Sequence, residues 1–547
     1  MTIAYTKKMI VLILLILSAG EVLASDPLNN RRVLSLPLTD HKLVIAHNMT
    51  NIIRYKGHRM EDSCDPTYYS PRENITAALG GLTQVLPMSA LFLADSSLEA
   101  AVEFEIRAAM QSGIDGFQFY YTLGGEDADK IILTYLNVAT KKQLDFKFTF
   151  CISHPSGSTE ASRINRFATR MNLILDQVGR SNPHWLRTPD GRLILYTWYG
   201  ETLADTSNAS PEQPAPLLMA RAYNKLEQAV KDSFAVVLSI NEFISVSKLN
   251  SYLDYFPAVW LWTLPYSTGY IGEMVWKECS KRKREFTGSA FPGFYTSKLL
   301  KKGTWEMYHT AAGATSAGIE KTERKYIVTG LSENFRKQWE FAIAKDVSIM
   351  NIITWNDYPE GHHLAPEINH NDGFSLLLLY YRAQWKNLPT PFGDRDILIT
   401  FYKKYNRMID PSPYNIPVIQ IEKPGTDPGI EDSIEVVTIL PNHAEIRIGK
   451  QVKEAGAGLQ STRFTATAGK VRVELKRNGT TVERIECPEW ITINPYRTDR
   501  ITYSFSNQTD EFYKKLFNGP GLIYSTEYDP GSPVNHINSY SKPDNRH

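Results

Sequence analysis

Residues 97–121 read SLEAAVEFEIRAAMQSGIDGFQFYY and contain one copy of the pattern that organises most of the chain. Apolar residues recur three and four positions apart over 97–113, which predicts an amphipathic helix that ends at Gly113. Residues 114–121 are mostly apolar and aromatic, which predicts a buried strand. A helix followed directly by a buried strand is typical of parallel α/β folds.

Further segments on both sides repeat this alternation. The predicted buried strands are 42–48, 114–121, 146–154, 192–200, 234–243, 257–265, 290–297 and 347–357. Helical patterns separate them, for example at 162–179 and 331–346. Eight such units predict a (β/α)₈ TIM barrel. An open doubly wound sheet is the alternative, but the chain has neither G-x-G-x-x-G nor G-x-x-x-x-G-K-[ST], the phosphate loops expected in such a sheet.

The composition changes near residue 410. Residues 411–432 are rich in proline, glycine and aspartate, which indicates a linker. Beyond them, short strand-like segments follow at regular spacing, and the RNGT stretch at 477–480 predicts a hairpin turn. We therefore expect a barrel over 25–410, an all-β sandwich domain over 433–525 and a polar tail over 526–547.

The N-terminal residues 1–24 have the composition of a secretory signal. Lys7 and Lys8 precede an apolar run, and Val22-Leu23-Ala24 predicts cleavage after Ala24. We expect a secreted, periplasmic or cell-surface protein that does not associate with a membrane once the signal is cleaved. A formal net charge of +1 gives no reason to expect a nucleic-acid partner, and we expect a monomer.

The predicted strand ends carry amides, aromatic rings and carboxylates. In a TIM barrel the substrate site lies at the C-terminal ends of the strands. The candidate substrate-binding residues are His47, Gln118, Tyr120, His154, Trp198, Glu242, Trp262, Tyr295, Trp355, Asn356 and His363. The nucleophile motif G-x-S-x-G is absent. These residue types favour hydrolysis of a neutral polysaccharide, in which rings stack on sugars and two carboxylates cleave the glycosidic bond.

The segment IITWNDYPEGHHLAPE, residues 352–367, supplies the candidate catalytic pair Asp357 and Glu360. Both carboxylates can point into the mouth of the barrel from the turn that contains Pro359. The alternative is that Asp357 caps this turn and Glu360 is a surface carboxylate.

Metal-ligand residue types are also frequent in this region. They are Glu360, His362, His363, Glu367 and His370. The motif H-E-x-x-H is absent, and Pro366 interrupts any helix. We therefore expect neither a metal nor a cofactor.

The stretch IITWNDYPEGHHLAP resembles the T-W-N-D-Y-G-E-S-H signature of glycoside hydrolase family 71, the α-1,3-glucanases or mutanases. LVIAHNMTN and EFEIRAAMQSGIDGFQF are similar to the family's first-strand and second-strand segments. The resemblance implies a barrel with a C-terminal β-sandwich and an endo-acting α-1,3-glucanase. It also implies that Asp357 and Glu360 are the catalytic carboxylates and that His47 lines the cleft.

The family is thought to invert the anomeric centre, and we expect Glu360 to act as the acid and Asp357 as the base. Pro359 and Gly361 stand where the family pattern has glycine and serine. This departure leaves two alternatives open. The enzyme would act on another α-linked polymer such as α-mannan, or the chain would be a non-catalytic carbohydrate-binding protein.

Overall fold

The computed structural model describes residues 37–58, 60, 64, 85–124, 126–241, 243–262, 267–301, 319–409, 418–423, 428–493 and 500–517. The predicted signal at 1–24, the candidate residue Glu242, half of the predicted linker (411–417 and 424–427) and the polar tail at 526–547 lie outside these residues.

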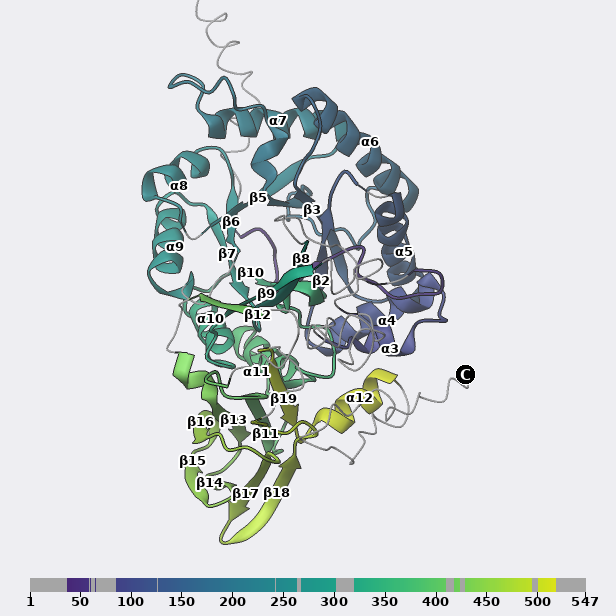
Figure 1. Cartoon of the computed structure of the whole chain (residues 1–547). Coiled ribbons are helices and arrows are strands. Elements are labelled where there is room, and N and C mark those ends of the chain that lie inside the picture. Colours follow the sequence, from purple (N-terminus) through teal and green to yellow (C-terminus); the bar gives the residue numbers. More distant parts are fainter. Residues whose placement is uncertain are drawn as a thin grey trace, which may run out of the picture.

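Eight parallel strands close into a barrel in the order β1-β10-β7-β6-β5-β4-β3-β2 (Figure 1). They are β1 (Leu43–Asn48), β2 (Gly116–Tyr121), β3 (Lys147–Ser153), β4 (Leu193–Trp198), β5 (Phe234–Ile240), β6 (Ala258–Leu261), β7 (Glu285–Ala290) and β10 (Ile349–Ile352). The register β1–β10, in which Leu43 pairs with Ile349, closes the ring. The predicted (β/α)₈ barrel is confirmed.

Helices surround the barrel (Figure 1). They are α3 (Met88–Phe92), α4 (Leu98–Gln111), α5 (Glu126–Lys142), α6 (Glu160–Val178), α7 (Ala215–Val230), α8 (Val246–Leu253), α9 (Gly272–Lys281), α10 (Glu333–Ala344) and α11 (Gly373–Trp385). Short helical turns are η4 (Gly200–Leu203), η5 (Ser267–Ile271), η6 (Tyr358–Glu360) and η7 (Pro428–Asp432). Strands buried on both faces explain the near-continuous apolar runs in the sequence.

The unit at residues 97–121 shows how the sequence specifies this arrangement. Ser97 caps α4, because its hydroxyl accepts a hydrogen bond from the Ala100 amide at 3.2 Å. After the helix, Gly113 has φ +93°, and a Cβ at this position would lie 2.6 Å from the Leu378 side chain of α11. Glycine therefore permits both the turn and the close packing that lead the chain into β2.

The seventh barrel strand differs from the prediction. We expected residues 290–297, but β7 spans Glu285–Ala290, and its segment EFTGSA is less apolar than the aromatic stretch that follows. The chain then forms β8 (Tyr295–Lys301), which lies outside the barrel in a three-stranded sheet with β9 (Ile319–Ile327) and β12 (Val418–Lys423). The aromatic residues of 290–297 thus do not continue the barrel strand.

The C-terminal domain is a sandwich of two antiparallel four-stranded sheets, ordered β16-β13-β11-β19 and β15-β14-β17-β18. Its strands are β11 (Ile397–Lys403), β13 (Ser433–Leu440), β14 (Ala444–Ile448), β15 (Gln451–Ala455), β16 (Gly458–Thr465), β17 (Arg472–Arg477), β18 (Thr480–Glu486) and β19 (Thr502–Ser506). Residues of both sheets, among them Val436 and Val473, form one apolar core. The helix α12 (Thr509–Phe517) follows β19.

Two features of this domain bear on the sequence expectations. The predicted hairpin at 477–480 forms between β17 and β18, with Asn478 and Gly479 at φ +51° and +77°. In contrast, β11 precedes the boundary that we expected at residue 410, and it pairs with β13 and β19 of the sandwich. The sandwich therefore begins before the linker, and the chain crosses between the domains more than once.

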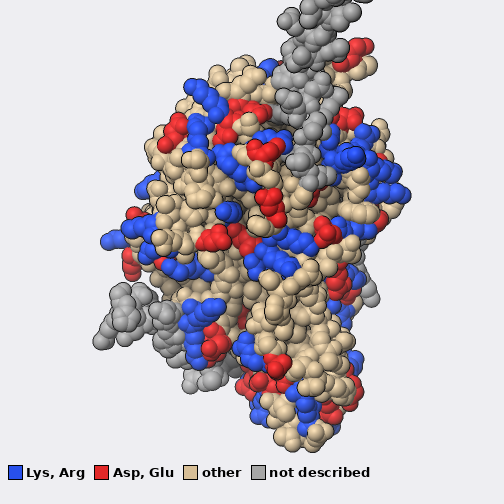
Figure 2. Space-filling view, turned by 180° about the vertical axis from the view of Figure 1, so that it is seen from behind, with Lys and Arg blue, Asp and Glu red and all other residues tan. Residues whose placement is uncertain are grey.

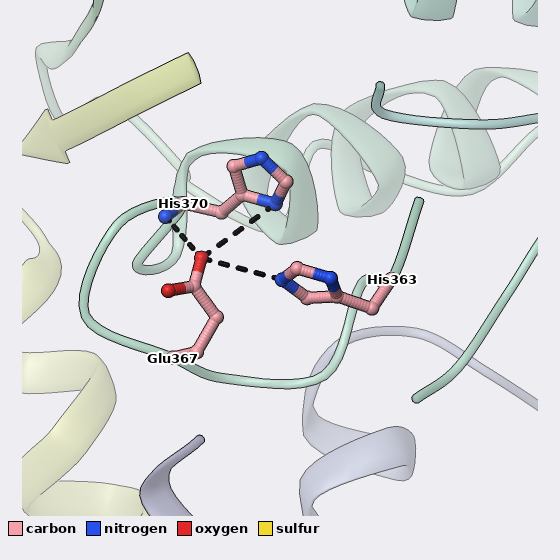
Figure 3. A group of neighbouring side chains, drawn as sticks. All are labelled: His363, Glu367 and His370. Carbon is pink, nitrogen blue, oxygen red and sulfur yellow. Dashed lines mark hydrogen bonds and ion pairs between the residues drawn. The ribbon is translucent and has the colours of Figure 1, made fainter. Parts of the chain in front are cut away.

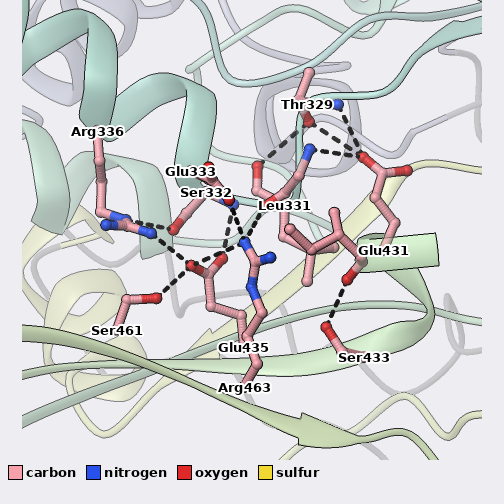
Figure 4. A network of polar contacts seen from close by, with 12 residues as sticks. Thr329, Leu331, Ser332, Glu333, Arg336, Glu431, Ser433, Glu435, Ser461 and Arg463 are labelled. Carbon is pink, nitrogen blue, oxygen red and sulfur yellow. Dashed lines mark hydrogen bonds and ion pairs between the residues drawn. The ribbon is translucent and has the colours of Figure 1, made fainter. Parts of the chain in front are cut away.

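A buried polar network joins the barrel to the sandwich (Figure 4). Glu435 on β13 is fully buried and accepts a hydrogen bond from Arg336 of α10 at 2.8 Å. It also accepts from the Ser332 amide at 2.9 Å and from the Ser461 hydroxyl at 2.7 Å. A buried carboxylate requires this many partners. The network fixes β13 against the N-terminus of α10.

The charged surface residues and the cysteines agree with the composition of the chain. Lysine and arginine are interspersed with acidic side chains on the face seen in Figure 2, in agreement with the balanced charge of the chain. Cys64, Cys151, Cys279 and Cys487 all lie in the described residues and are buried without forming disulfides. Within the described part of the chain, no helix combines the length and apolar character needed to cross a membrane.

Candidate active site

The turn after β10 presents the two candidate carboxylates. Asp357 precedes η6, and its Oδ1 accepts a hydrogen bond from the Glu360 amide at 3.2 Å. The Asp357 amide in turn donates to the hydroxyl of Thr354 at 2.8 Å. Asp357 therefore does cap this turn, as the alternative in the sequence analysis proposed. Capping does not exclude a chemical role, because the second carboxylate oxygen of Asp357 points to a different partner.

That partner is His362, which contacts both carboxylates. Its Nε2 lies 3.1 Å from Oδ2 of Asp357 and 3.4 Å from Oε2 of Glu360. Burial alone opposes a charge on His362, but the two carboxylates outweigh it and raise its pKa to about 9. His362 is therefore an imidazolium at neutral pH. Burial also raises the pKa of Asp357, and His362 acts against that increase.

Gly361 allows the chain to make this turn. Its φ is +64°, and a Cβ would lie 2.8 Å from the Tyr295 carbonyl oxygen and 2.9 Å from the Tyr295 amide nitrogen. Glycine is thus required both by conformation and by the close approach of β8. The turn places His362 between the carboxylates and directs the next residue, His363, into the protein interior.

Aromatic rings surround the carboxylates at the mouth of the barrel. The Trp262 ring lies 5.7 Å from His362, 5.4 Å from His47 and 3.9 Å from Trp198, measured between centroids. Trp198 and Trp262 are both partly exposed. The Tyr120 hydroxyl lies 3.2 Å from Nδ1 of His154, and the His154 ring stacks on Tyr199, which contacts Trp198. Four of the predicted residues, Tyr120, His154, Trp198 and Trp262, thus gather around one opening.

Two predicted residues lie deeper in the barrel. His47 is fully buried, and burial lowers its pKa to about 3, so the ring is neutral. Gln118 pairs in register with His47 and donates to Oδ1 of Asn351 at 3.3 Å. These two side chains form the floor beneath the opening.

Four other predicted residues are packing or anchoring residues in this structure. The Trp355 indole is fully buried and donates to Glu105 of α4 at 2.7 Å, and burial raises the pKa of that carboxyl to about 7. Asn356 accepts from the Met49 amide at 2.7 Å and donates to two carbonyls of the loop after β1. Tyr295 is 3% exposed, and His363 is not exposed.

His362 is the functional candidate that our residue list missed. The list included His363, but the structure places His362 at the carboxylates and His363 in the interior. The signature T-W-N-D-Y-G-E-S-H already carried the signal, because its histidine aligns with position 362.

A pocket of about 240 Å³ opens beside the mouth, between the ends of β4 and β5. Its wall includes Trp198, Tyr199, Glu201, Asn241 and Phe243. Tyr199 is 49% exposed and Phe243 is 84% exposed. Exposed rings beside amide and carboxylate groups are the combination that binds a sugar through stacking and hydrogen bonds.

Two groups of side chains have the ligand types for a metal ion. They are Asp357, Glu360 and His362 at the mouth and His363, Glu367 and His370 in the interior. In each group the three potential ligand atoms lie within 4.8 Å of one another. In the first group His362 carries a proton, which opposes metal binding.

Residues 321–496 match the sequence profile of glycosyl hydrolase family 71. This range contains β10, the candidate carboxylates, His362 and most of the sandwich. The resemblance to glycosyl hydrolase family 71 is confirmed. A mutanase of Penicillium rubens is 25% identical over 167 residues, which are 26% of this chain and 36% of that protein. The chain therefore spans about a third of this relative's length.

Solved structures are also similar to this chain. An endo-α-mannosidase of family GH99 from Bacteroides thetaiotaomicron is 13% identical, covers 64% of this chain and 99% of its own, and has a TM-score of 0.42. A family GH2 glycosyl hydrolase from Bacteroides cellulosilyticus is 10% identical, covers 82% of this chain and 46% of its own, and has a TM-score of 0.39.

Proposed function

We propose that the protein is a glycoside hydrolase that cleaves an α-linked polysaccharide, with α-1,3-glucan as the substrate. The observation that carries the proposal is the contact of His362 with both Asp357 and Glu360 at the mouth of the barrel. Hydrolysis of a glycosidic bond needs two carboxyl groups with different roles, one as the acid and the other as the base or nucleophile. The mutanase among the relatives supports the α-glucan linkage.

The surroundings of the two carboxylates differ, and this difference supports separate roles. Asp357 is 6% exposed and lies against the imidazolium of His362, which opposes the increase that burial causes in the pKa of Asp357 and favours the ionised form that a base needs. The Glu360 side chain is 43% exposed, so it can turn toward the leaving-group oxygen. We therefore propose Glu360 as the acid and Asp357 as the base.

The stereochemical course depends on the distance between these carboxylates. Their potential ligand oxygens lie within 4.8 Å of each other. Inverting enzymes hold the two carboxyl groups about 6.5–9.5 Å apart, which leaves room for a water molecule. Inversion therefore requires the Glu360 side chain to swing outward when substrate binds. The exposure of that side chain permits this movement.

The first experiment measures the release of reducing ends from a panel of polymers. The panel contains α-1,3-, α-1,4- and α-1,6-glucans, α-mannan and a β-glucan. We expect activity on α-1,3-glucan. Preferential release of reducing ends from α-mannan would show that the protein is a glycoside hydrolase with α-mannan as its substrate. Binding of a polymer without released sugar would instead support the non-catalytic alternative.

Two variants test the roles of the carboxylates. Asp357→Asn is expected to lower kcat by several orders of magnitude on every substrate. Glu360→Gln is expected to lose activity on the polymer but to retain much more on an aryl glycoside, whose leaving group needs no acid. The control is Asp176→Asn on α6, where an exposed aspartate pairs with Arg180. Full activity of both active-site variants would refute the proposal.

The anomer that forms first gives the stereochemical course. Proton NMR of a reaction on an α-linked substrate shows the β anomer if the enzyme inverts and the α anomer if it retains. Inversion would support the outward movement of Glu360. Retention would mean that the short separation seen in the structure is also the working one.

A further inference from the structure

A second group of histidine and carboxylate side chains lies in the loop between η6 and α11, away from the mouth of the barrel. It consists of His363, Glu367 and His370 (Figure 3). His363 and Glu367 are not exposed, and His370 is 3% exposed. The proposed hydrolysis does not use these side chains. Their burial together therefore calls for a separate explanation.

The two imidazole rings converge on one carboxylate oxygen. His363 Nε2 lies 3.4 Å from Oε1 of Glu367, and His370 Nδ1 lies 3.6 Å from the same oxygen. A tetrahedral zinc ion with bonds of about 2.0–2.1 Å holds its ligand atoms about 3.3–3.4 Å apart. The distances from the two imidazole nitrogens to Oε1 of Glu367 are thus already close to the ligand–ligand distance around a tetrahedral ion.

The distance between the two imidazole nitrogens determines how far the side chains must move to bind an ion. The nitrogens of His363 and His370 lie within 4.8 Å of each other, and the rings are stacked with centroids 4.8 Å apart. The two imidazoles must therefore approach by at most about 1.4 Å to reach a tetrahedral edge. Rotation of the two side chains is sufficient for a movement of this size.

Three of the four imidazole nitrogens lack hydrogen bonds within the described part of the chain. Both ring nitrogens of His363 and Nδ1 of His370 are buried without a hydrogen-bond partner among those residues. Leaving buried polar atoms unpaired is costly, and such atoms call for an ion or water. A bound cation satisfies one nitrogen of each ring.

The Glu367 carboxylate is held in place by the backbone. It accepts a hydrogen bond from the Asn369 amide at 2.5 Å and another from the His370 amide. These bonds orient Oε1 toward both rings, as Figure 3 shows. The nearby Lys403 ammonium is directed elsewhere, since it donates to the Arg500 carbonyl at 2.9 Å and to the Thr502 hydroxyl at 3.0 Å. The ligands are therefore oriented before an ion arrives.

We propose that His363, Glu367 and His370 bind one divalent transition-metal ion, with zinc as the best match to two imidazoles and one carboxylate. Water completes the tetrahedron. The group is closed to substrate, and its loop is bound to the sandwich. The Ser504 amide of β19 donates to the Asn369 carbonyl at 2.7 Å, and the Asn371 side chain donates to the Ser504 carbonyl at 2.8 Å. The ion therefore has a structural role, in which it fixes the loop after the catalytic turn.

The test begins with the metal content of the purified full chain. Inductively coupled plasma mass spectrometry is performed after dialysis against metal-free buffer and again after addition of zinc. We expect about one zinc per chain, and we expect zinc to raise the thermal midpoint as a ligand that binds the folded state does. A chelator should reverse that increase. Zinc-edge X-ray absorption should show two imidazole ligands.

Variants locate the ion. His363→Gln and His370→Gln should each lower zinc affinity on the order of a hundredfold or more. His443→Gln, which removes a histidine that is 67% exposed in the sandwich, should leave it unchanged. His362→Gln should also retain zinc.

Three results would overturn the proposal. The first is a wild-type chain that contains no zinc, iron or manganese and shows no thermal shift when zinc is added. The second is zinc binding that survives both His363→Gln and His370→Gln but is lost in His362→Gln, which would place the ion at the mouth. The third is an absorption spectrum of the wild type without imidazole ligands, which decides the matter even where the variants fail to fold.

Discussion

Replacing His362 by glutamine tests the electrostatics of the turn that carries Asp357 and Glu360. The imidazolium lies 3.1 Å from Asp357 and 3.4 Å from Glu360, and its positive charge faces both carboxylates. Glutamine has a similar length and can still donate a hydrogen bond, but it carries no charge. The variant therefore removes the charge of His362 and leaves most of its volume.

The expected size of the effect follows from the pKa of His362. The folded protein raises this pKa from 6.5 to about 9. Because the folded-state pKa is the higher one, the charged ring stabilises the protein fully below pH 6.5, and this stabilisation disappears as the pH rises through 9. At about 1.36 kcal/mol per pKa unit, the contribution is about 3 kcal/mol at pH 6 and about 0.4 kcal/mol at pH 9.

The assay is urea-induced unfolding of the wild type and of His362→Gln at pH 6, 7.5 and 9. The difference in free energy of unfolding between the two proteins should shrink by roughly 2–3 kcal/mol across this range. NMR of ¹³C-labelled histidine, with the His362 signal assigned by its loss in the variant, should show titration near pH 9. His443→Gln serves as the control, because an exposed ion pair contributes little. A difference that is constant with pH, or a His362 signal that titrates below pH 6.5, would refute the reasoning.

Asn356→Ala should lower the free energy of unfolding by about 2–4 kcal/mol, because three hydrogen bonds to the loop after β1 are lost. An unchanged urea midpoint would contradict this anchoring role. Trp355→Phe removes the hydrogen bond to Glu105 and should lower stability by about 1.5–3 kcal/mol in thermal unfolding, whereas KM should stay the same. A large rise in KM with unchanged stability would instead show that Trp355 binds substrate. Arg336→Met should cost about 3–5 kcal/mol, since it leaves Glu435 buried without this partner, and Arg336→Met combined with Glu435→Leu should cost less. Additive losses in the double variant would show that the two side chains do not interact.

Much of the barrel could be predicted because its strands are buried on both faces and read as apolar runs. The seventh strand could not be, since EFTGSA at 285–290 is held in the barrel by its pairing with β6 and β10 and has little apolar character of its own. The neighbouring stretch 290–297 is richer in aromatic residues, and local sequence therefore favoured it. Pairing between distant segments is information that a single window of sequence does not contain.

The candidate site was predictable in its residue types but not in its orientations. Asp357 and Glu360 followed from their place after a buried strand and from the family signature. The choice between His362 and His363 depends on the left-handed conformation of Gly361, which turns one ring toward the carboxylates and the next into the interior. Trp355 likewise follows β10 closely, yet its indole points to Glu105 on α4. Adjacent positions on a tight turn face different ways, and composition does not reveal which.

The contacts of Ser504 with Asn369 and Asn371 have a consequence for recombination between relatives. They tie the chain just beyond the turn that carries Asp357 and Glu360 to a strand that lies more than a hundred residues further along the sequence. β11 adds a second connection, since it belongs to the sandwich although it precedes the linker. The C-terminal domain is therefore not an interchangeable appendage. A chimaera that exchanges it must carry β11 and the loop at 362–372 from the same parent, or the turn that bears Asp357 loses its support.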